Sequence, residues 1–370
     1  MMNSFEVQRI LIIKLSALGD IIMTLPLLAA LKEAFPNAEI DWLVNKSFQD
    51  ILKGQKDLQQ ILPFQRTEWG RKNFWKNRKT FFQLLQNLRN RHYEIVLDFQ
   101  GLFRSGFLAF CTRSPIRVGF QNAREFAPLF YTKKIPVPDL EVHAFDRYQS
   151  LVEALGVSVS NPPKYEIRIG DEEKIWAEQR LSPYQAPFVG VIPQTRWITK
   201  IWGTEKLMAV LKKISPWTTP VLFGSAEGIE EGKQLESVCN GKALNLIGQT
   251  NLPQLFAFLQ RMAIVLTNDS GPMHIAAALK IPVVAIFGPT NPKRTGPFLW
   301  ANQKIFHATD RVPCAPCYKR YCPTQMECMS AISPQEVVDY LLKSLEHSYE
   351  IKKMNLKEMG IELYQDLHIF

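Results

Sequence analysis

The sequence has 370 residues, more than one ordinary hydrophobic core organises, which predicts two domains. Hydrophobic residues make up 46% and charged residues 21%, as is typical of globular proteins, and no uninterrupted apolar run approaches the roughly 20 residues needed to cross a bilayer. The formal net charge is +9. No secretory leader pattern precedes the apolar run 10–13, so we expect a cytoplasmic protein.

The first half of the chain alternates strand and helix patterns. Apolar runs predict strands over 10–15, 39–44, 93–99 and 116–119, and longer amphipathic patterns predict helices over 21–35 and 144–155. Pro26 is tolerated only near a helix start, so the regular part of the first helix is expected to begin near Thr24. The segment 158–164, rich in Pro and Ser, predicts a linker.

Alternation restarts after the linker. The predicted strands are 188–192, 220–223, 243–246, 263–267 and 283–287, and the predicted helices are 205–214, 229–238, 252–261 and 273–279. Repeated βα units on both sides of a linker predict two doubly wound parallel sheets with helices on both faces. Ligands of such sheets bind outside the carboxyl ends of the strands, so two facing sheets would share one cleft.

A basic and aromatic segment spans 66–91. It has eight Lys and Arg residues against one acid, Glu68, with Trp69, Phe74, Trp75, Phe81 and Phe82 interleaved. Such a mixture suits an anionic membrane surface, a polyanionic acceptor or nucleic acid. The alternative is a solvated helix face whose apolar side packs in the core.

Four of the six cysteines lie close together, at Cys314, Cys317, Cys322 and Cys328. The first two form a C-x2-C pair, which suggests a structural metal, but the five-residue spacing of the second pair is wider than in zinc ribbons. In a cytoplasmic chain, reduced thiols are the alternative that we favour.

The segment 267–292 has the strongest chemical pattern. A strand ends at Thr267, and Asp269, Ser270 and Gly271 lead directly into a helix whose first N–H groups are available to an anion. His274, one turn inside the helix, would add a donor. This pattern predicts a diphosphate site, against the alternative of a plain βαβ unit with an acidic cap.

Further polar residues follow the neighbouring strands. Thr195 and Lys200 come after strand 188–192 and are suited to a diphosphate leaving group, although a loop lysine is usually only solvated. Glu227, Glu230 and Glu231 follow strand 220–223, where an acid binds a ribose diol or simply faces a helix dipole.

The first strand leads into KLSALGDIIMTLP, a glycine turn that ends in the acid Asp20. Gln100 and Arg104 follow strand 93–99, and Arg124 lies beyond the next strand; together they would line a pocket for an acidic sugar, or form ordinary salt bridges. The dinucleotide, Walker A, HExxH and GxSxG patterns are all absent from the sequence. A metal-free, diphosphate-binding, two-domain enzyme is what remains.

Six segments in order, KLSALGDIIMTLP, LDFQGLFRS, NAREFAPLFY, TRWITKIW, LFGSAEGIEE and TNDSGPMHIAAAL…VAIFGPTNP, resemble the ADP-heptose–lipopolysaccharide heptosyltransferases of glycosyltransferase family 9. The resemblance runs from about residue 8 to about residue 345. It implies the GT-B fold and inverting transfer of L-glycero-D-manno-heptose from ADP-heptose to the lipopolysaccharide inner core, without a required cofactor or metal. It implies an acceptor domain over 1–160 with the catalytic base and an ADP-sugar domain over 161–345, while 346–370 is a tail without an assigned role.

The resemblance also implies the roles of single residues. Asp20 matches the catalytic base, and Lys200 matches a group that neutralises the leaving diphosphate. The implied donor-binding residues are Thr195, Lys200, Asp269, Ser270, Gly271 and His274, with Glu230, or Glu227, on the ribose. The implied acceptor-binding residues are Arg124 and either Arg71 or Lys72, beside Gln100 and Arg104.

The first-domain segments look like heptosyltransferase I, which acts on Kdo of Kdo2-lipid A, whereas LFGSAE and TNDSGPMH look closer to heptosyltransferase II, which adds to the first heptose. Since acceptor choice belongs to the first domain, Kdo2-lipid A is the favoured acceptor. We expect an enzyme at the cytoplasmic face of the inner membrane of a Gram-negative bacterium, in peripheral contact with it, and no nucleic-acid partner. The alternatives are another nucleotide sugar, a sugar-nucleotide epimerase and a non-catalytic polyanion-binding module.

Overall fold

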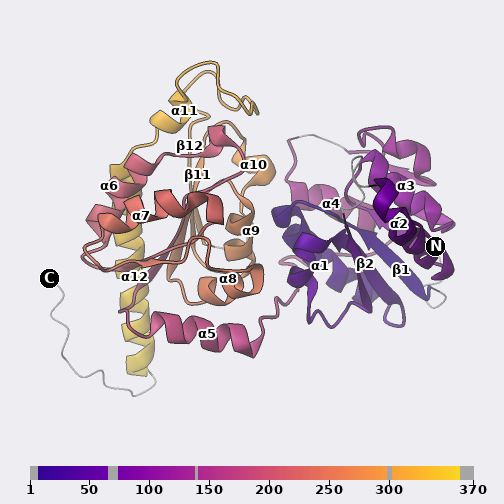
Figure 1. Ribbon diagram of the computed structural model, residues 1–370, viewed down its shortest axis with the longest axis horizontal. Coiled ribbons are helices and arrows are strands. Elements are labelled where there is room, and N and C mark those ends of the chain that lie inside the picture. Colours follow the sequence, from indigo (N-terminus) through magenta and orange to yellow (C-terminus); the bar gives the residue numbers. More distant parts are fainter. Residues whose placement is uncertain (1–6, 66–73, 138–140, 298–301, 359–370) are drawn as a thin grey trace. The chain divides into compact units, whose positions relative to one another are not determined.

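The computed structural model describes residues 7–65, 74–137, 141–297 and 302–358. The chain forms two compact units, each built on one six-stranded sheet (Figure 1). The first unit is Met1–Glu173 with Pro292–Trp300, and the second is Lys174–Asn291 with Ala301–Phe370. Within the described ranges, no helix is both long enough and apolar enough to cross a membrane.

The first sheet is parallel throughout, in the order β3-β2-β1-β4-β5-β6. Its strands are β1 (Arg9–Ile13), β2 (Glu39–Asn45), β3 (Gln60–Phe64), β4 (Ile95–Asp98), β5 (Ile116–Phe120) and β6 (Lys133–Ile135). Its helices are α1 (Leu18–Ala34), η1 (Lys46–Leu52), α2 (Phe74–Asn90), α3 (Phe103–Cys111), η2 (Ala127–Phe130) and α4 (Ala144–Glu153).

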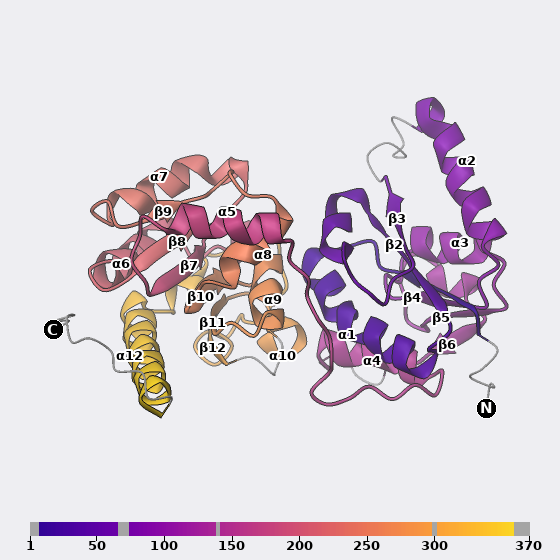
Figure 2. The same ribbon diagram turned by 90° about the horizontal axis from the view of Figure 1, so that it is seen from below.

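Connection handedness explains the two helical layers. The chain leaves β1 through α1 towards β2, but leaves β4 through α3 in the opposite direction towards β5, and right-handed crossovers then put α1 and α3 on opposite faces. Helix α4 packs on α1, and α2 packs on α3 (Figure 2). Residues 10–13 of the central strand β1 are wholly buried, and each such side chain contributes about 1.5–3 kcal/mol by leaving water.

The second sheet has the same topology, in the order β12-β11-β10-β7-β8-β9. Its strands are β7 (Phe188–Ile192), β8 (Thr219–Leu222), β9 (Leu244–Asn245), β10 (Ile264–Asn268), β11 (Val283–Phe287) and β12 (Gln303–His307). The accompanying helices are α5 (Asp171–Leu181), η3 (Ile198–Lys200), α6 (Thr204–Ile214), η4 (Ala226–Gly228), α7 (Ile229–Ser237), α8 (Leu252–Leu259), α9 (Gly271–Ala278), α11 (Glu327–Ser330) and α12 (Pro334–Glu358). The short helix α10 (Pro292–Thr295) belongs to the first unit.

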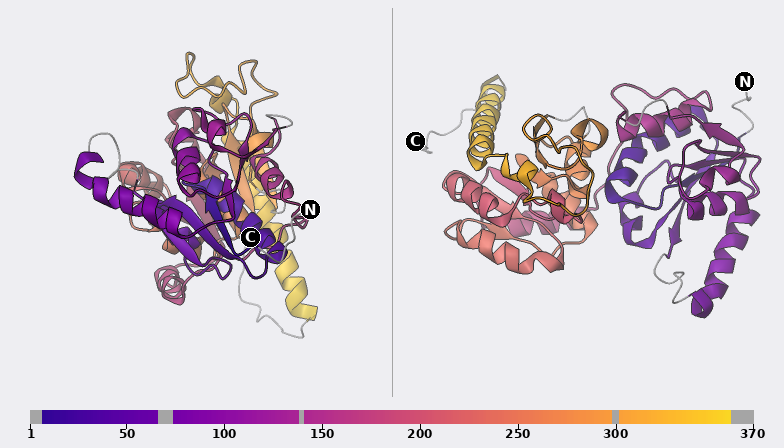
Figure 3. Two further views of the ribbon diagram at one scale, coloured as in Figure 1. Left: turned by 90° about the vertical axis from the view of Figure 1, so that its right-hand side faces the viewer. Right: turned by 90° about the horizontal axis from the view of Figure 1, so that it is seen from above.

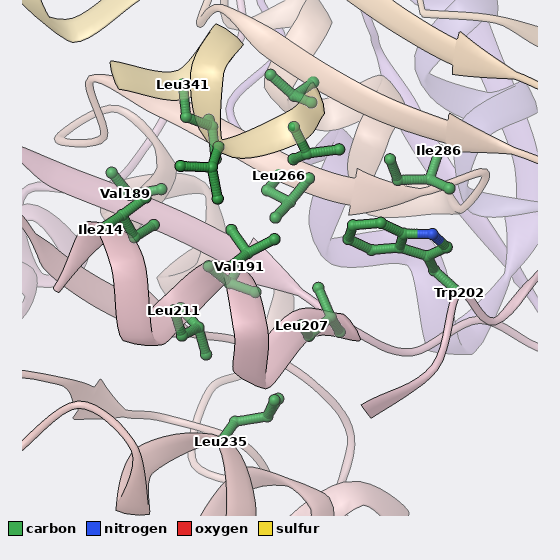
Figure 4. Close-up of a cluster of buried hydrophobic side chains, with 14 of the residues drawn as sticks. Val189, Val191, Trp202, Leu207, Leu211, Ile214, Leu235, Leu266, Ile286 and Leu341 are labelled. Carbon is green, nitrogen blue, oxygen red and sulfur yellow. The ribbon is translucent and has the colours of Figure 1, made fainter. Parts of the chain in front are cut away.

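One hydrophobic core fixes α6 and α12 to this second sheet (Figure 4). Val189 and Val191 of β7 pack with Leu211 of α6 and Leu341 of α12, and all four are fully buried. Trp202 seals the core near the end of β10: its ring nitrogen donates to the Ile332 carbonyl at 3.3 Å, and its backbone N–H donates to Asn268 Oδ1 at 3.3 Å. The end of β10 is therefore tied to the core of its unit.

The predicted two-sheet parallel α/β architecture is confirmed. The predicted start of the first helix near Thr24 is wrong, because α1 begins at Leu18 and contains Pro26. The reason is the carboxylate of Asp20, which accepts the Ala17 backbone N–H at 3.0 Å and holds the first turn in place. The basic helix is α2, and its upstream part over 66–73 lies outside the described residues.

In each sheet the strand order reverses at one point, which we call the switch point. Ligands of open parallel sheets bind at such switch points. In the first unit the reversal lies between β1 and β4, whose following turns carry Asp20 and Gln100. In the second it lies between β7 and β10, whose following turns carry Lys200 and Asp269 (Figure 3 gives two further views of the sheets). The topology thus brings the predicted site residues of each unit together in pairs.

Candidate active site

Asp20 lies in the first turn of α1, directly beyond β1. Its Oδ2 accepts the Ala17 N–H at 3.0 Å, and its Oδ1 accepts the Tyr148 hydroxyl at 2.6 Å. The positive end of the helix dipole also favours negative charge at this position. The carboxylate is therefore oriented from two sides, with the Tyr148 contact contributed by α4, which packs on α1.

The buried side chain of Lys14 lies close to the Asp20 carboxylate. Lys14 is 2% exposed, and its Nζ donates to the Phe99 carbonyl at 3.0 Å and to the Tyr148 oxygen at 2.9 Å, while lying 3.9 Å from Asp20 Oδ2. Burial lowers the pKa of Lys14; the charges of Asp20 and Asp98 raise it, and that of Arg147 lowers it. Burial, followed by the charge of Asp20, raises the pKa of Tyr148, so that its hydroxyl remains a donor to Asp20.

The hydrogen bonds that join Lys14, Tyr148 and Asp20 lead to a first prediction, which concerns the variant Tyr148→Phe. The variant removes the hydroxyl between Lys14 and Asp20 without changing the ring, so the Asp20 carboxylate loses one stabilising donor. Protonated Asp20 is then favoured, and we expect the acidic limb of the kcat/KM profile to move to higher pH, with a rate loss of about threefold to tenfold near neutrality. Rates measured across the pH range test it.

The charges of Asp20, Asp98 and Arg147 act on Lys14, whose Nζ lies 3.9 Å from Asp20 Oδ2. The matched control is the same profile with Tyr131→Phe, which removes a hydroxyl that donates to Asp98 at 2.7 Å. An acidic limb that moves equally in both variants would contradict a specific role of Tyr148.

Gln100 braces the turn that carries Asp20. Its Oε1 accepts the N–H groups of Leu15 at 3.0 Å and Ser16 at 2.9 Å. Beneath it, buried Asp98 accepts the N–H groups of Gln100 at 2.9 Å and Gly101 at 3.1 Å. The structure therefore places the predicted acceptor residue Gln100 beside the Asp20 turn and gives it a structural contact there.

The other predicted acceptor residues lie in different positions. Arg124 is exposed, and its backbone N–H donates to the Gly101 carbonyl at 3.1 Å, which joins its loop to the Gln100 turn. Arg104 is exposed on α3, with its guanidinium 5.6 Å from the Phe64 ring centroid. Arg71 and Lys72 lie outside the described residues. Gln100 and Arg124 thus share one region, whereas Arg104 packs towards β3.

In the second unit, Asp269 is the centre of a polar cluster. It is 6% exposed, and its Oδ2 accepts from Lys200 Nζ at 2.5 Å and from the Thr290 hydroxyl at 2.6 Å. The Thr195 hydroxyl donates to the Asp269 carbonyl at 3.2 Å. Asp269 is predicted from the sequence to bind the donor, and in the structure its carboxylate contacts Lys200 and Thr290. The turn after β7 and the turn after β10 are joined through it.

Helix α9 starts directly after this cluster. Ser270 is its N-cap, and the Ser270 and Thr267 hydroxyl oxygens lie 3.1 Å apart. Gly271 begins the helix and Pro272 has no N–H, so the N–H groups of the first turn come from Gly271, Met273 and His274. His274 is 5% exposed, one turn inside α9. Such a helix start attracts anions.

The three acids that follow β8 make different contacts in the structure. Glu230 is exposed and pairs with Lys233 at 3.2 Å, while Glu231 accepts the Thr204 hydroxyl at 2.9 Å. Glu227 lies in η4, where hydrogen bonding to Ser225 lowers its pKa. Gln194 Oε1 accepts the Ser225 N–H at 2.9 Å, which joins this turn to the one after β7. Glu227 and Glu230 both remain at this edge of the sheet.

Trp197 and Arg320 were not predicted from the sequence. Lys200 Nζ lies 4.7 Å from the Trp197 ring centroid, and the Arg320 guanidinium lies 5.0 Å from the same centroid. The Thr199 hydroxyl donates to the Lys319 carbonyl at 2.8 Å, and the Tyr318 N–H donates to the Pro289 carbonyl at 2.8 Å. The cysteine-containing segment therefore contacts the turn after β7, at Thr199, and the turn after β11, at Pro289. Local residue spacing does not predict these long-range contacts.

The cysteines of that segment are free thiols. Burial raises the pKa of Cys328, and the three neighbouring thiols, Cys314, Cys317 and Cys322, add to the effect. Among the residues that the structure describes, no group of three or more His, Cys, Asp and Glu side chains is arranged to hold a metal ion. The segment contacts the turns after β7 and β11 through residues 317–320: the N–H groups of Cys317 and Tyr318 donate to the Pro289 carbonyl, Lys319 accepts from Thr199, and Arg320 lies over Trp197.

Known proteins resemble this chain in sequence over most of their lengths. Lipopolysaccharide heptosyltransferase 1 of Pseudomonas aeruginosa is 28% identical, over 90% of this chain and 97% of its own length. Lipopolysaccharide heptosyltransferase 2 of Salmonella typhimurium is 27% identical, over 78% of this chain and 85% of its own.

Solved structures agree in fold. A family 9 glycosyl transferase from Veillonella parvula has a TM-score of 0.78 at 24% identity and covers 94% of this chain and 99% of its own. The ADP-heptose lps heptosyltransferase II of E. coli has a TM-score of 0.74 at 23% identity and covers 92% of this chain and 100% of its own. Residues 81–327 match the family described as glycosyltransferase family 9 (heptosyltransferase). The chain thus belongs to glycosyltransferase family 9 and is a glycosyltransferase with the GT-B fold.

Proposed function

We propose that this enzyme transfers L-glycero-D-manno-heptose from ADP-heptose to the inner core of lipopolysaccharide, with inversion, and that Kdo of Kdo2-lipid A is the acceptor. The observation that carries the proposal is the pair of switch-point sites: an oriented carboxylate at Asp20 and a cation at Lys200 beside a helix start. Two relatives named for lipopolysaccharide heptosyl transfer, matched over most of their lengths, support it.

On the acceptor side, Asp20 is the general base. It takes the proton from an acceptor hydroxyl while that oxygen attacks the anomeric carbon from the face opposite the diphosphate. One base and one direct displacement account for inversion, and no covalent intermediate with the enzyme forms. Lys14 and Tyr148 hold the carboxylate ready for this step.

On the donor side, the proposal gives the developing diphosphate charge to Lys200, Thr195 and the start of α9 at Ser270 and Gly271, with His274 as an added donor. Asp269 holds Lys200 in position. Glu230, or Glu227, binds the ribose diol. Because these groups supply positive charge and N–H donors to the leaving ADP, the proposal includes no metal.

Basic residues of the first unit bind the acidic Kdo sugar in this proposal. Arg124 is the first choice because its loop adjoins the Gln100 turn beside Asp20. Arg71, Gln100 and Arg104 complete the proposed acceptor set. Residues 1–160 then act as the acceptor domain and 161–345 as the ADP-sugar domain, at the cytoplasmic face of the inner membrane of a Gram-negative bacterium, in peripheral contact with it.

The direct test is incubation of the enzyme with ADP-heptose and Kdo2-lipid A. We expect release of ADP together with a gain of one heptose on the lipid, seen by mass spectrometry. The matched arm replaces the acceptor by heptosyl-Kdo2-lipid A, and product only in that arm would replace the favoured acceptor by that of heptosyltransferase II.

Competition by ADP and UDP checks the nucleotide, and stronger inhibition by UDP would contradict an ADP-sugar donor. Consumption of the donor without any acceptor would indicate an epimerase, and nucleic-acid binding that weakens with salt, without transfer, would indicate a polyanion-binding module.

A further inference from the structure

Helix α3 and the turn η2 present large apolar side chains to solvent. Phe103, Phe110, Phe126 and Leu129 are 49%, 53%, 76% and 76% exposed. With Phe107 and Phe130 they form what we call the aromatic face. Exposed clusters of this kind mark a surface that meets another body, because scattered exposure is normal but clustering is not.

Direct contacts between rings hold the aromatic face together. Phe103, Phe107 and Phe110 recur at helical spacing on one side of α3, and the Phe130 ring centroid lies 5.4, 6.2 and 5.9 Å from theirs. Gly106 permits the close approach of η2, since a Cβ there would lie 2.9 Å from Phe130 Cδ2 and 3.1 Å from the Ala127 carbonyl oxygen. The rings are therefore held against each other while their outer edges remain exposed.

The backbone before η2 is strained where the face is most exposed. Glu125 and Phe126 have φ values of 55° and 61°, the left-handed region that residues other than glycine rarely adopt. The side chain of Phe126, at this position, is 76% exposed. Strain kept at an exposed apolar position indicates a functional constraint.

The chain segment that contains the aromatic face is rich in basic residues. Between Phe74 and Lys134 the chain has eleven Lys and Arg residues and three acids, of which Asp98 is buried. The Arg117 guanidinium lies 5.7 Å from the Phe110 ring centroid. The C-terminal half of helix α2 packs on α3, and its N-terminal half, which carries exposed Lys76, Arg78 and Lys79, extends away from α3 (Figure 2). Trp75, in the first turn of α2, is 74% exposed.

We propose that the aromatic face docks on an anionic lipid bilayer, with Phe126 and Leu129 entering the interfacial region and the Lys and Arg residues of this part of the chain, Arg117 among them, meeting lipid phosphates. This step rests on the proposed function, which requires a lipid-anchored acceptor. The Phe103 N–H donates to Glu125 Oε2 at 3.3 Å, and the Arg124 N–H donates to the Gly101 carbonyl at 3.1 Å. The aromatic face thus adjoins the turn that carries Gln100 and the loop that carries Arg124.

Charge complementarity selects the bilayer over a second copy of the chain. A two-fold contact through this face would bring two surfaces with the same excess of positive charge together, and like charges then oppose association. An anionic lipid surface offers the opposite charge and accepts aromatic rings at its interface.

Flotation with vesicles tests the proposal. Full-length protein is mixed with vesicles of phosphatidylcholine alone or of equal parts phosphatidylcholine and phosphatidylglycerol. We expect binding to the anionic vesicles, and a loss of about tenfold or more in the double variant Phe126→Asn with Leu129→Gln, because two apolar side chains leave the interface. Asparagine suits the left-handed backbone at position 126, so folding is expected to persist.

The matched control is Ile175→Gln with Trp217→Gln, two side chains of the second unit that are 54% and 50% exposed. We expect it to bind vesicles as the unaltered protein does. Equal binding by the Phe126 and Leu129 variant, or equal loss in the control, overturns the proposal. So does self-association in sedimentation that the variant abolishes while vesicles fail to bind.

A transfer assay separates this inference from the proposed function. With a Kdo acceptor that lacks acyl chains, the Phe126 and Leu129 variant should keep the unaltered rate, and with the acceptor embedded in vesicles it should lose about tenfold. If the unaltered protein shows no transfer in either assay but still binds vesicles, the proposed function is wrong and the docking face remains supported. If the Phe126 and Leu129 variant transfers at the unaltered rate in both assays, the docking proposal alone is wrong.

Discussion

Asp20→Asn is expected to lower the rate of heptose transfer by about a thousandfold while leaving ADP-heptose affinity within about twofold. A carboxamide cannot take the acceptor proton, but its one oxygen can still accept the N–H of Ala17, as Oδ2 of Asp20 does now. Its NH2 group would take the place of Oδ1 and donate to the oxygen of Tyr148, whose hydroxyl now donates to Asp20. The helix start is therefore preserved, and the loss falls on the chemical step.

The measurement is single-turnover transfer together with calorimetric binding of ADP-heptose and a thermal melt. Asp171→Asn, which removes an exposed acid from the first turn of α5, is the control for a general effect of charge and should transfer normally. Transfer by Asp20→Asn at close to the unaltered rate, with binding intact, would remove Asp20 from the role of base.

Much of the fold follows from sequence because buried parallel strands form short apolar runs. The predicted runs 10–15 and 283–287 correspond to β1 and β11, where Ile10 and Val284 are fully buried. Edge strands β3, β6 and β12 were not predicted, since their burial is mixed and Pro63 interrupts β3. Helix α3 was not predicted either, because its exposed phenylalanines obscure an amphipathic pattern.

The candidate site divides in the same way. Local pattern was enough to single out Asp20 and Lys200, each at a turn after a strand. The partners that position them are distant in sequence: Tyr148 lies 128 residues from Asp20, and Asp269 lies 69 residues from Lys200. Such pairings depend on strand order, and periodicity does not determine strand order.

Lys200→Ala is expected to lower kcat by about a hundredfold, with a smaller rise in KM, because Lys200 is proposed to stabilise charge that develops as ADP departs. The variant has a second consequence. Asp269, 6% exposed, would lose the ion pair that now lies at 2.5 Å, and an uncompensated carboxylate would face the site. Removing one partner of a buried pair costs about 3–5 kcal/mol, so folding must be measured as well.

A double-mutant cycle separates the two effects of Lys200. If the lysine serves only to neutralise Asp269, the pair Lys200→Ala with Asp269→Asn should recover most of the rate, since both charges are then absent. If Lys200 stabilises the leaving diphosphate, the double variant regains thermal stability but stays about a hundredfold slow. Lys212→Ala, on the exposed side of α6, is the matched control and should be neutral. Full kinetic recovery in the double variant would therefore reduce Lys200 to a structural partner, whereas recovered stability with a slow rate places its charge on the reaction.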